Sequence, residues 1–359
     1  MAGFNNVDPV LQSEKVHADD FVYDLPEENV AEHPTNPRDN SKLLVLNQQK
    51  DTREEIRFSE IGASLNSGDV LVVNDTKIHP ARYETIKEET GDVIDVFLLR
   101  ELEPRVWEVQ VTPPRKVRIG NTLRFAEDIM ADIIDNTVSS GRVVQFQQNE
   151  EYIINRLRSI GKMPLPPYIN RKAREEDRDE YQTIFADKVG SVAVPASGLH
   201  FTESLVSSLK KQGIVFAEIT VHLGLGGYER VMLSEIDKYT MNSEQFAIPV
   251  QAAEKINTAL INNNRVIAMG ASVVRALMSS HFQGEKIIPK EGWTDLFIYP
   301  PFHFSILDGL ITNFHHPQAP TLLLQSAFFG REKILNTYQY AVKQDYRFQV
   351  FGDAMLLLK

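Results

Sequence analysis

The chain lacks cysteine, long apolar runs and a surplus of basic residues. With no cysteine among its 359 residues, it has no disulfide, no thiolate metal ligand and no cysteine nucleophile. We find no run of about 18 apolar residues and therefore expect no membrane span. The N-terminus has no basic stretch followed by an apolar core, so we expect no secretory signal and a cytoplasmic protein.

Basic residues are also few relative to acidic ones. Lysine and arginine number 38, against 49 aspartate and glutamate residues, which gives a formal net charge of −11. Broad, non-specific binding to nucleic acid needs a basic surface, so this charge argues against it. A local basic patch on an otherwise acidic protein is still compatible with the composition.

Residues 56–155 contain many short strand-like segments and little helical periodicity. The segment VWEVQV, residues 106–111, places apolar and polar residues in near alternation, which is the period of a strand with one buried face. Gly68, Gly91, Gly120 and Gly141 separate successive segments. Short strands at such spacing predict a closed antiparallel β-barrel over residues 56–155.

On both sides of this stretch the pattern is that of an α/β protein. From about residue 156, strand-like runs alternate with segments of helical character, which predicts a layered sheet covered by helices. We therefore expect residues 1–55 and 156–359 to form one discontinuous α/β domain, interrupted by the inserted barrel. The runs predicted as strands are 43–46, 191–195, 214–222, 265–269, 295–299 and 310–314.

Polar residues in apolar surroundings follow four of these predicted strands. Ligands of open α/β sheets bind beyond the carboxyl ends of the strands, so these residues are candidates for one site. Three of the loops lead into helices with predicted caps at Thr202, Ser272 and Thr321, and helix N-termini suit a carboxylate or phosphate. The candidates are His200, His222, Ser272, Arg275, Asn313 and His315.

Each candidate also has a purely structural interpretation. His200, between Leu199 and Phe201, fits a hydrogen-bonded packing residue, and His222 is similar. The predicted caps need no ligand, and Arg275 fits an exposed charge on a helix. What favours a shared site is that these residues recur at the same structural position.

Neither a metal site nor a nucleotide-binding loop has a clear signature. None of the nine histidines has HExxH or comparable spacing, so we predict no metal. The segment HLGLGGY, residues 222–228, fits G-x-G after a strand but lacks the third glycine, and a tight turn is the alternative. Asp295 and Asp353 are acidic candidates, for which capping or turn stabilisation is the simpler interpretation.

Two clusters of basic residues are candidates for phosphate contacts. Arg115, Lys116 and Arg118 lie between prolines and a glycine in the predicted barrel, with Arg82 nearby. A phosphate contact and a solvated face both remain open for this cluster. The second cluster, within residues 171–174, is followed directly by acidic residues, so we interpret it as a solvated face.

Longer segments of the chain resemble one known family. They are FVYDLPEENVAEHPTNPRDNSKLLVL, GDVLVVNDTKIHPARY, GKMPLPPYINR, YQTIFADKVGSVAVPASGLHFT, VHLGLGGYERV, MNSEQFAIP, TDLFIYPPFHFSILDGLITNFHHPQAPTLLLQSAFFG and YRFQVFGDAML. In this order they cover essentially residues 20–359. As a set they resemble the S-adenosylmethionine:tRNA ribosyltransferase-isomerase family of queuosine biosynthesis.

The resemblance implies a fold, a reaction and partners. Family members have an α/β domain interrupted by a closed β-barrel. They transfer the ribosyl part of S-adenosylmethionine to 7-aminomethyl-7-deazaguanine in a tRNA anticodon and isomerise it, giving epoxyqueuosine, adenine and methionine. The implied co-substrate is S-adenosylmethionine, with no tightly bound cofactor, and the implied partner is that tRNA. No membrane is involved, and a monomer is favoured, although the sequence does not indicate an oligomeric state.

The resemblance also assigns roles to residues of this chain. We expect His200 and His222 to handle protons, because histidine suits proton transfer near neutral pH, with base and acid unassigned. Asn313 and His315 are expected to orient the ribose or the adenine. The residues expected to bind S-adenosylmethionine are Ser197, Gly198, Gly224, Ser272 and Arg275, and those expected to contact tRNA are Arg82, Arg115, Lys116 and Arg118.

Three loops depart from the usual family pattern. PASGLHF (195–201) stands where the family commonly has PTAGLHF, GLGGY (224–228) where it has GAGTF, and GASVVR (270–275) where it has GTTSVR. The missing hydroxyls keep a second hypothesis open, a tRNA-binding relative that is non-catalytic or shifted in substrate. A third is a methyltransferase with the same co-substrate, which needs an acidic residue at the end of the strand after HLGLGGY.

Overall fold

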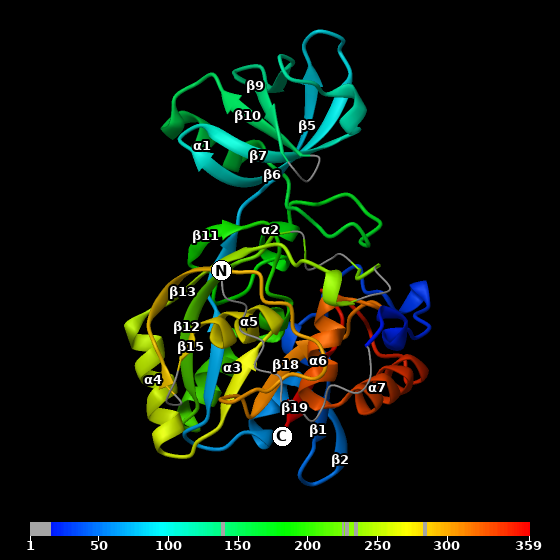
Figure 1. Ribbon diagram of the computed structural model, residues 1–359, viewed down its shortest axis with the longest axis vertical. Helices are drawn as coiled ribbons and strands as arrows, with labels where there is room; N and C mark the ends of the chain where they lie inside the picture. Colours follow the sequence, from blue (N-terminus) through cyan, green and yellow to red (C-terminus); the bar gives the residue numbers. More distant parts are fainter. Residues whose placement is uncertain (1–15, 138–140, 225, 227–229, 233–235, 283–285) are drawn as a thin grey trace.

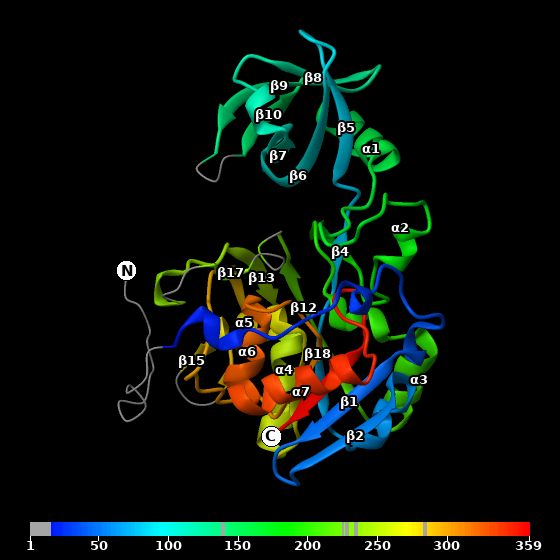
Figure 2. The same cartoon turned by 90° about the vertical axis from the view of Figure 1, so that its right-hand side faces the viewer.

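The structure is a computed structural model that describes residues 16–359 except 138–140, 225, 227–229, 233–235 and 283–285. A large α/β body carries a separate β-barrel at one end (Figure 1). A view from the side shows the same two parts, joined by a narrow connection (Figure 2). The predicted fold class, an α/β domain with a closed antiparallel barrel, is confirmed.

The body is built on a nine-stranded sheet. Its central strands β12, β3, β14 and β18 are parallel, β19 is antiparallel to β18, and β1 is parallel to β19. Antiparallel strands form both edges. In spatial order the strands are β17 (Lys290–Thr294), β13 (Glu244–Ile248), β12 (Val215–His222), β3 (Val70–Asn74), β14 (Val266–Met269), β18 (Gly309–Asn313), β19 (Ala354–Leu358), β1 (Lys42–Asn47) and β2 (Thr52–Arg57).

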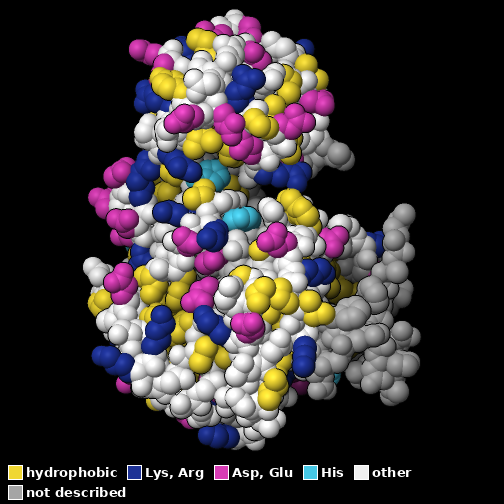
Figure 3. Space-filling model, turned by 90° about the vertical axis from the view of Figure 1, so that its left-hand side faces the viewer, with side chains coloured by type: hydrophobic (Ala, Val, Ile, Leu, Met, Phe, Trp, Pro, Cys, Tyr) yellow, Lys and Arg dark blue, Asp and Glu magenta, His cyan; other side chains and the backbone are white. Residues whose placement is uncertain are grey.

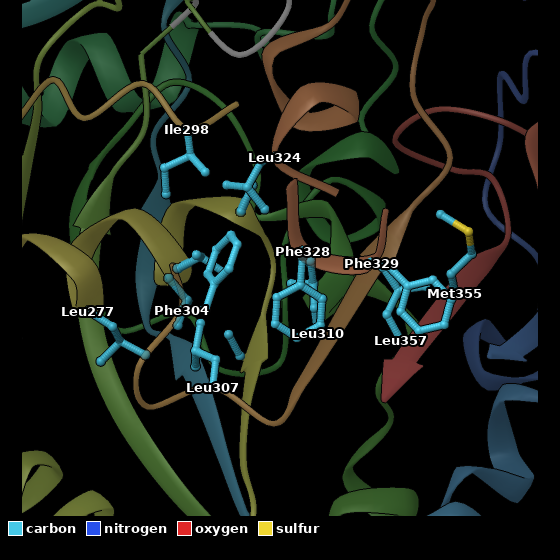
Figure 4. Packing of buried hydrophobic residues seen from close by; sticks show 14 of the residues in the cluster. Leu277, Ile298, Phe304, Leu307, Leu310, Leu324, Phe328, Phe329, Met355 and Leu357 are labelled. Carbon is cyan, nitrogen blue, oxygen red and sulfur yellow. The ribbon is translucent and has the colours of Figure 1, made fainter. Parts of the chain in front are cut away.

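Helices cover both faces of this sheet. All residues of β3, β18 and β19 are buried, as expected of strands covered on both sides. On one face, Leu277 and Phe328 from two helices pack in the same core cluster as Leu310 of the sheet (Figure 4). The α5 face carries α4 (Val250–Ile261), α5 (Ala271–Ser280), α6 (Pro320–Phe329) and α7 (Arg331–Lys343), and the α3 face carries α3 (Glu203–Lys211) and the 3-10 helix η5 (Phe58–Ser64).

Local signals explain some helix starts and not others. Thr202 Oγ1 accepts a hydrogen bond from Leu205 N (3.2 Å) and caps α3, as predicted. The predicted cap at Thr321 is wrong, because Pro320 already begins α6; proline suits the first helical position since that N–H has no partner in the helix. Ser272 is the second residue of α5 and not the residue before it.

Two of the predicted strands are also corrected. Residues 295–299 contain no strand, and the run 191–195 contributes only Ser191, the last residue of β11. β11 pairs in parallel with β4 outside the large sheet. The short elements of the body are β4 (Thr76–Ile78), α2 (Asp177–Glu180), β11 (Lys188–Ser191), β15 (His281–Phe282) and β16 (Lys286–Ile287).

Six antiparallel strands close into the barrel, in the order β10-β7-β6-β5-β8-β9. In β7 the side chains of Val109 and Val111 are buried and that of Gln110 is exposed, which is the alternation seen in the sequence. Helix α1 (Glu150–Ile160) packs on the barrel core through Ile153 and Leu157. The strands are β5 (Arg82–Lys87), β6 (Val93–Glu103), β7 (Val106–Thr112), β8 (Thr122–Ala126), β9 (Ile129–Asn136) and β10 (Arg142–Phe146).

The barrel begins later than predicted. Strand β3 lies in the middle of the large sheet, so the boundary at residue 56 is wrong, and the barrel strands run from Arg82 to Phe146. The run VLVV at residues 70–73 is continuous and apolar, which is typical of a strand buried on both faces and not of a barrel strand. Residues 1–15 of the predicted α/β domain lie outside the described residues.

Two neighbouring segments connect the barrel to the body. Arg82 N donates to Lys162 O (3.2 Å), and Lys162 N donates to Arg82 O (2.9 Å), so the entering and leaving segments are paired. Tyr83 Oη donates to Pro80 O (2.7 Å) on the entering segment. Beside this connection, a hollow separates barrel and body, and basic and histidine side chains border it (Figure 3).

Candidate functional site

The carboxyl ends of the four parallel strands form the edge of the body that faces the barrel (Figures 1 and 2). Strands β19 and β1 run the opposite way, so their first residues lie at this same edge. Ser41 and Asp353, which precede these two strands, are buried there. Loops from six strands therefore surround one region, here called the barrel-facing edge, where open α/β sheets bind ligands.

His200 ends the 3-10 helix η7 (Ala196–His200) at this edge and is only 4% exposed. Its Nδ1 is 2.8 Å from Ser41 Oγ, and its ring stacks on Phe58 with centroids 4.8 Å apart. Burial lowers the pKa of His200 to about 4, while the Asn313 side chain acts in the opposite direction. The imidazole is therefore neutral at neutral pH.

Several buried polar atoms near His200 lack a hydrogen-bond partner among the described residues. They include His200 Nε2, Asn313 Oδ1, Gln349 Nε2 and Thr183 Oγ1. Asn313 Nδ2 donates to the backbone carbonyl of Gln349 (3.1 Å), which holds these two residues next to each other. An unsatisfied buried polar group costs about 1–3 kcal/mol, so such a group of donors and acceptors is suited to a polar ligand.

Ser197, Gly270 and Ser272 converge beside this group. A Cβ built on Gly270 would lie 3.4 Å from Ser197 Oγ and 4.0 Å from Ser272 Oγ. Gly270 has φ +91°, which favours glycine, so a larger residue would strain the backbone and crowd both hydroxyls. At Gly198 a Cβ would lie 3.0 Å from Thr183. Two hydroxyl groups, one from α5 and one from the 3-10 helix that contains Ser197, thus lie beside the start of α5.

His222 ends β12 and is held by a chain of hydroxyls. Its Nδ1 is 2.8 Å from Thr76 Oγ1, which is 2.7 Å from Ser191 Oγ. Ser191 Oγ also accepts a hydrogen bond from Leu223 N (2.8 Å). The His222 ring lies against Gly190, where a Cβ would be 2.6 Å from Cε1. Burial lowers the pKa of His222, but its side chain is only half-buried and remains accessible.

His200, His222 and Asn313 lie on the same face of the sheet. Side chains alternate between the two faces of a strand. Phe216 in β12 and Ile311 in β18 both belong to the α3-face core, and His222 and Asn313 follow them by an even number of residues. Three strand spacings separate β12 from β18, about 14 Å, so an extended ligand is needed to reach both histidines.

His315 and Arg275 lie on the opposite, α5 face. His315 Nε2 is 3.5 Å from Thr312 Oγ1, and Thr312 and Asn313 point to opposite faces because they are consecutive in β18. Burial, followed by the charge of the neighbouring His316, lowers the pKa of His315 to about 3. Arg275 is 5% exposed and forms an ion pair with Glu244. The structure therefore separates these two residues from the other candidates, and Arg275 is not an exposed helix charge.

The loop after His222 is described in part. Gly224 is described, and a Cβ there would meet open space. Leu225 and residues 227–229 of the segment HLGLGGY lie outside the described residues. Asp353 fits the simpler prediction of a turn residue, since its Oδ1 accepts from Lys42 N and its Oδ2 from Arg347 N, each at 2.8 Å.

The basic residues predicted to contact tRNA lie on the barrel and differ in their surroundings. Arg82 pairs with Asp95 (2.8 Å) and Lys116 with Asp92 (2.6 Å). Arg115 and Arg118 are exposed and form no ion pair among the described residues. The second cluster is not simply solvated, because its Arg171 pairs with the buried Asp177 (2.7 Å).

Sequence reasoning missed the residues that hold the histidines. Ser41 and Thr76 lie far along the chain from their partners, and no local pattern indicates such contacts. Thr183 falls in a segment used only for the family resemblance, and Ser191 begins the run 191–195, which was predicted as a strand and not as part of a site. Among the described residues, no group of three or more histidine or acidic side chains could hold a metal ion. The described part of the chain contains no helix long and apolar enough to span a membrane.

Comparison with known proteins decides the family. The family described as "Queuosine biosynthesis protein" matches residues 18–357. The chain belongs to this family. Among relatives in the queuosine biosynthesis family, proteins called S-adenosylmethionine:tRNA ribosyltransferase-isomerase occur in Carboxydothermus hydrogenoformans (46% identity over 341 residues) and Chloroherpeton thalassium (43% over 341 residues). Each alignment covers 94% of this chain and 99% of the relative.

A solved structure from the queuosine biosynthesis family agrees with this assignment. The crystal structure of S-adenosylmethionine tRNA ribosyltransferase from Thermotoga maritima is 32% identical, with a TM-score of 0.54. The match covers 94% of this chain and all of that one. The resemblance predicted from the sequence is thus confirmed.

Proposed function

We propose that this chain transfers the ribosyl moiety of S-adenosylmethionine to 7-aminomethyl-7-deazaguanine in a tRNA anticodon and isomerises it. The products are epoxyqueuosine in tRNA, adenine and methionine. The observation that carries the proposal is the family match over residues 18–357. The barrel-facing edge adds support, since it combines a half-buried histidine with buried polar atoms that have no hydrogen-bond partner among the residues described.

The reaction needs a base close to the sulfonium. A sulfonium acidifies the neighbouring C–H bonds, so loss of the C5′ proton gives an ylide that expels adenine; the deazaguanine amine then adds, and methionine leaves as the epoxide closes. We assign the base to His222, because its ring is neutral and accessible. Thr76 Oγ1 is within 3.5 Å of the carbonyl of Lys188. Donation to that carbonyl leaves Thr76 Oγ1 to accept from His222 Nδ1–H, so the lone pair is on Nε2.

The remaining candidates bind or orient the co-substrate. Ser197, Gly198 and Ser272 lie near the first turn of α5, which suits the methionine carboxylate, and Gly224 borders open space beside His222. His200 and Asn313 are proposed to orient the ligand through Nε2 and Oδ1, the atoms that have no hydrogen-bond partner within the described ranges. His315 and Arg275 act from the other face as positioning residues.

The tRNA contacts are proposed on the barrel. Arg115 and Arg118 are the exposed members of the set that form no ion pair among the described residues. Arg82 and Lys116 would exchange an acidic partner for phosphate. We place this reaction in the cytoplasm with S-adenosylmethionine as co-substrate, no tightly bound cofactor and a monomeric protein.

Neither alternative is favoured. A non-catalytic relative was suggested by the missing loop hydroxyls, but Ser197 and Ser272 supply hydroxyls beside Gly270. A methyltransferase needs an acidic residue at the end of the strand that follows HLGLGGY. That strand is β13, which is antiparallel and carries Glu244 at its start, paired with Arg275.

A turnover assay tests the proposal. The protein is incubated with S-adenosylmethionine and precursor tRNA, and the small products are separated. We expect adenine and methionine in equal amounts, in step with modification of the tRNA. Release of S-adenosylhomocysteine indicates a methyltransferase, and no release indicates a non-catalytic relative; either result contradicts the proposal.

A further inference from the structure

The sequence contains two tryptophans, and both lie where the barrel meets the body. Trp107, in β7, packs at the edge of the barrel core and contacts His79 of the connecting segment, with ring centroids 5.9 Å apart. Trp293, in the edge strand β17 of the body, is 55% exposed. The guanidinium of Arg100, in β6 of the barrel, lies 5.7 Å from the centre of the Trp293 ring.

Arg100 joins the two parts at this point. Its Nε is 2.6 Å from Glu108 Oε2 in β7, whereas Trp107, the residue before Glu108, points to the opposite face of the strand and toward the barrel core. We call Arg100 and Trp293 the junction cluster. Figure 2 shows β6 and β7 on the side of the barrel nearest the body, with β13 and β17 opposite them. The cluster therefore lies above the barrel-facing edge and not within the core of either part.

The exposure of Trp293 favours binding over a packing role. Tryptophan side chains that only stabilise a fold bury most of their surface. Trp293 leaves more than half of its surface exposed, and Arg100, itself 54% exposed at the side chain, covers only part of the ring. An exposed indole beside an arginine presents flat surfaces on which bases stack.

We propose that the junction cluster is a stacking platform for unpaired bases of the tRNA anticodon loop. The proposal rests on the proposed function, which requires a single-stranded loop to reach the barrel-facing edge. A net charge of −11 repels a polyanion, whereas stacking needs no net charge. The basic side chains that border the hollow (Figure 3) are positioned to hold the backbone while the bases stack.

Fluorescence gives a direct test because the chain has two tryptophans. Trp107→Phe leaves Trp293 as the one emitter, and Trp293→Phe leaves Trp107. Each variant is titrated with a stem-loop RNA of the anticodon arm and, as the matched control, with a fully paired RNA of equal phosphate number. We expect the stem-loop to quench Trp293 strongly and far more than Trp107, and the duplex to quench neither. Equal quenching by both RNAs, or none by either, overturns the proposal.

Affinity measurements separate stacking from a simple contact between barrel and body. Trp293→Ala should weaken stem-loop binding roughly tenfold or more, and Trp293→Tyr should restore most of it, with S-adenosylmethionine binding unchanged in both. Arg100→Ala also breaks the contact between the two parts but keeps the indole, so its loss should be smaller. If Trp293→Ala binds the stem-loop as tightly as the parent, the cluster is only a contact between domains.

Adenine release keeps the two proposals distinguishable. If the stem-loop quenches the tryptophan fluorescence of the parent protein but the protein releases no adenine, the proposed function is contradicted and the stacking platform is supported. If the parent protein releases adenine and the Trp293→Ala variant binds RNA as tightly as the parent, only the stacking platform is contradicted.

Discussion

His200 Nδ1 lies 2.8 Å from the hydroxyl of Ser41, a residue 159 positions away in the chain. Ser41 directly precedes β1, whose direction brings this residue to the barrel-facing edge. The bond occupies one ring nitrogen, and the other, Nε2, is one of the buried atoms that lack a hydrogen-bond partner in the described part of the chain. The ring is thereby held in one orientation and kept neutral by burial.

The neutral state of His200 predicts a pH dependence of stability. Its pKa is about 4 in the folded protein and near 6.5 in an unfolded chain. Between these values the unfolded state binds more protons, so the stabilisation is complete above about pH 6.5 and is lost as the pH falls to about 4. We expect His200 to account for a loss of about 3 kcal/mol over this range. Urea unfolding of the parent and of His200→Gln checks this, since the variant should show a correspondingly flatter profile; parallel profiles would contradict it.

His222 and its support predict two different kinetic defects. His222→Ala should lower kcat for adenine release by about 10²–10⁴-fold, the usual contribution of a general base. Thr76→Val keeps the imidazole but removes the hydroxyl at 2.8 Å, so kcat should fall less and the pH profile should shift, with KM nearly unchanged. His303→Ala, at an exposed site, is the matched control. A His222→Ala protein with parental kcat would refute the assigned base.

The buried ion pair between Arg275 and Glu244 predicts an effect on stability. Both side chains are almost fully buried, so removing one partner leaves an uncompensated charge. Glu244→Gln and Arg275→Met should each lower the free energy of unfolding by about 3–5 kcal/mol. The double variant should be less destabilised than the sum of the two. Chemical denaturation measures all three, and additive effects would show that the pair does not interact.

The barrel patch predicts a salt-dependent effect on tRNA binding. Replacing Arg115 and Lys116 by alanine should weaken binding and reduce the slope of log K against log salt by about 0.7–0.9 per lost phosphate contact. Asp92→Asn is the informative counterpart, because it frees Lys116 from its ion pair and should strengthen binding. Identical salt curves for the parent and the double variant would show that the patch is only a solvated face.

Local patterns predicted the parts of the fold that depend on neighbouring residues. The Thr202 cap and the alternation in β7 follow from adjacent side chains. The barrel boundary failed because the continuous apolar run of β3 was grouped with the barrel strands. The sheet that β3 joins is decided by its partners β12 and β14, which lie far along the chain. For the same reason the contact between Ser41 and His200 was not predictable. The placement of Arg275 on the opposite face required the direction of α5 across the sheet.

The paired segments at the base of the barrel have a consequence for the architecture of the chain. Because Arg82 and Lys162 exchange backbone hydrogen bonds at 3.2 and 2.9 Å, the chain leaves the body and returns to it at nearly the same point. None of the nine strands of the large sheet lies between these two residues. The barrel is therefore an insertion in the chain of the body. A short turn that joins residue 81 directly to residue 163 would keep all nine strands of the large sheet.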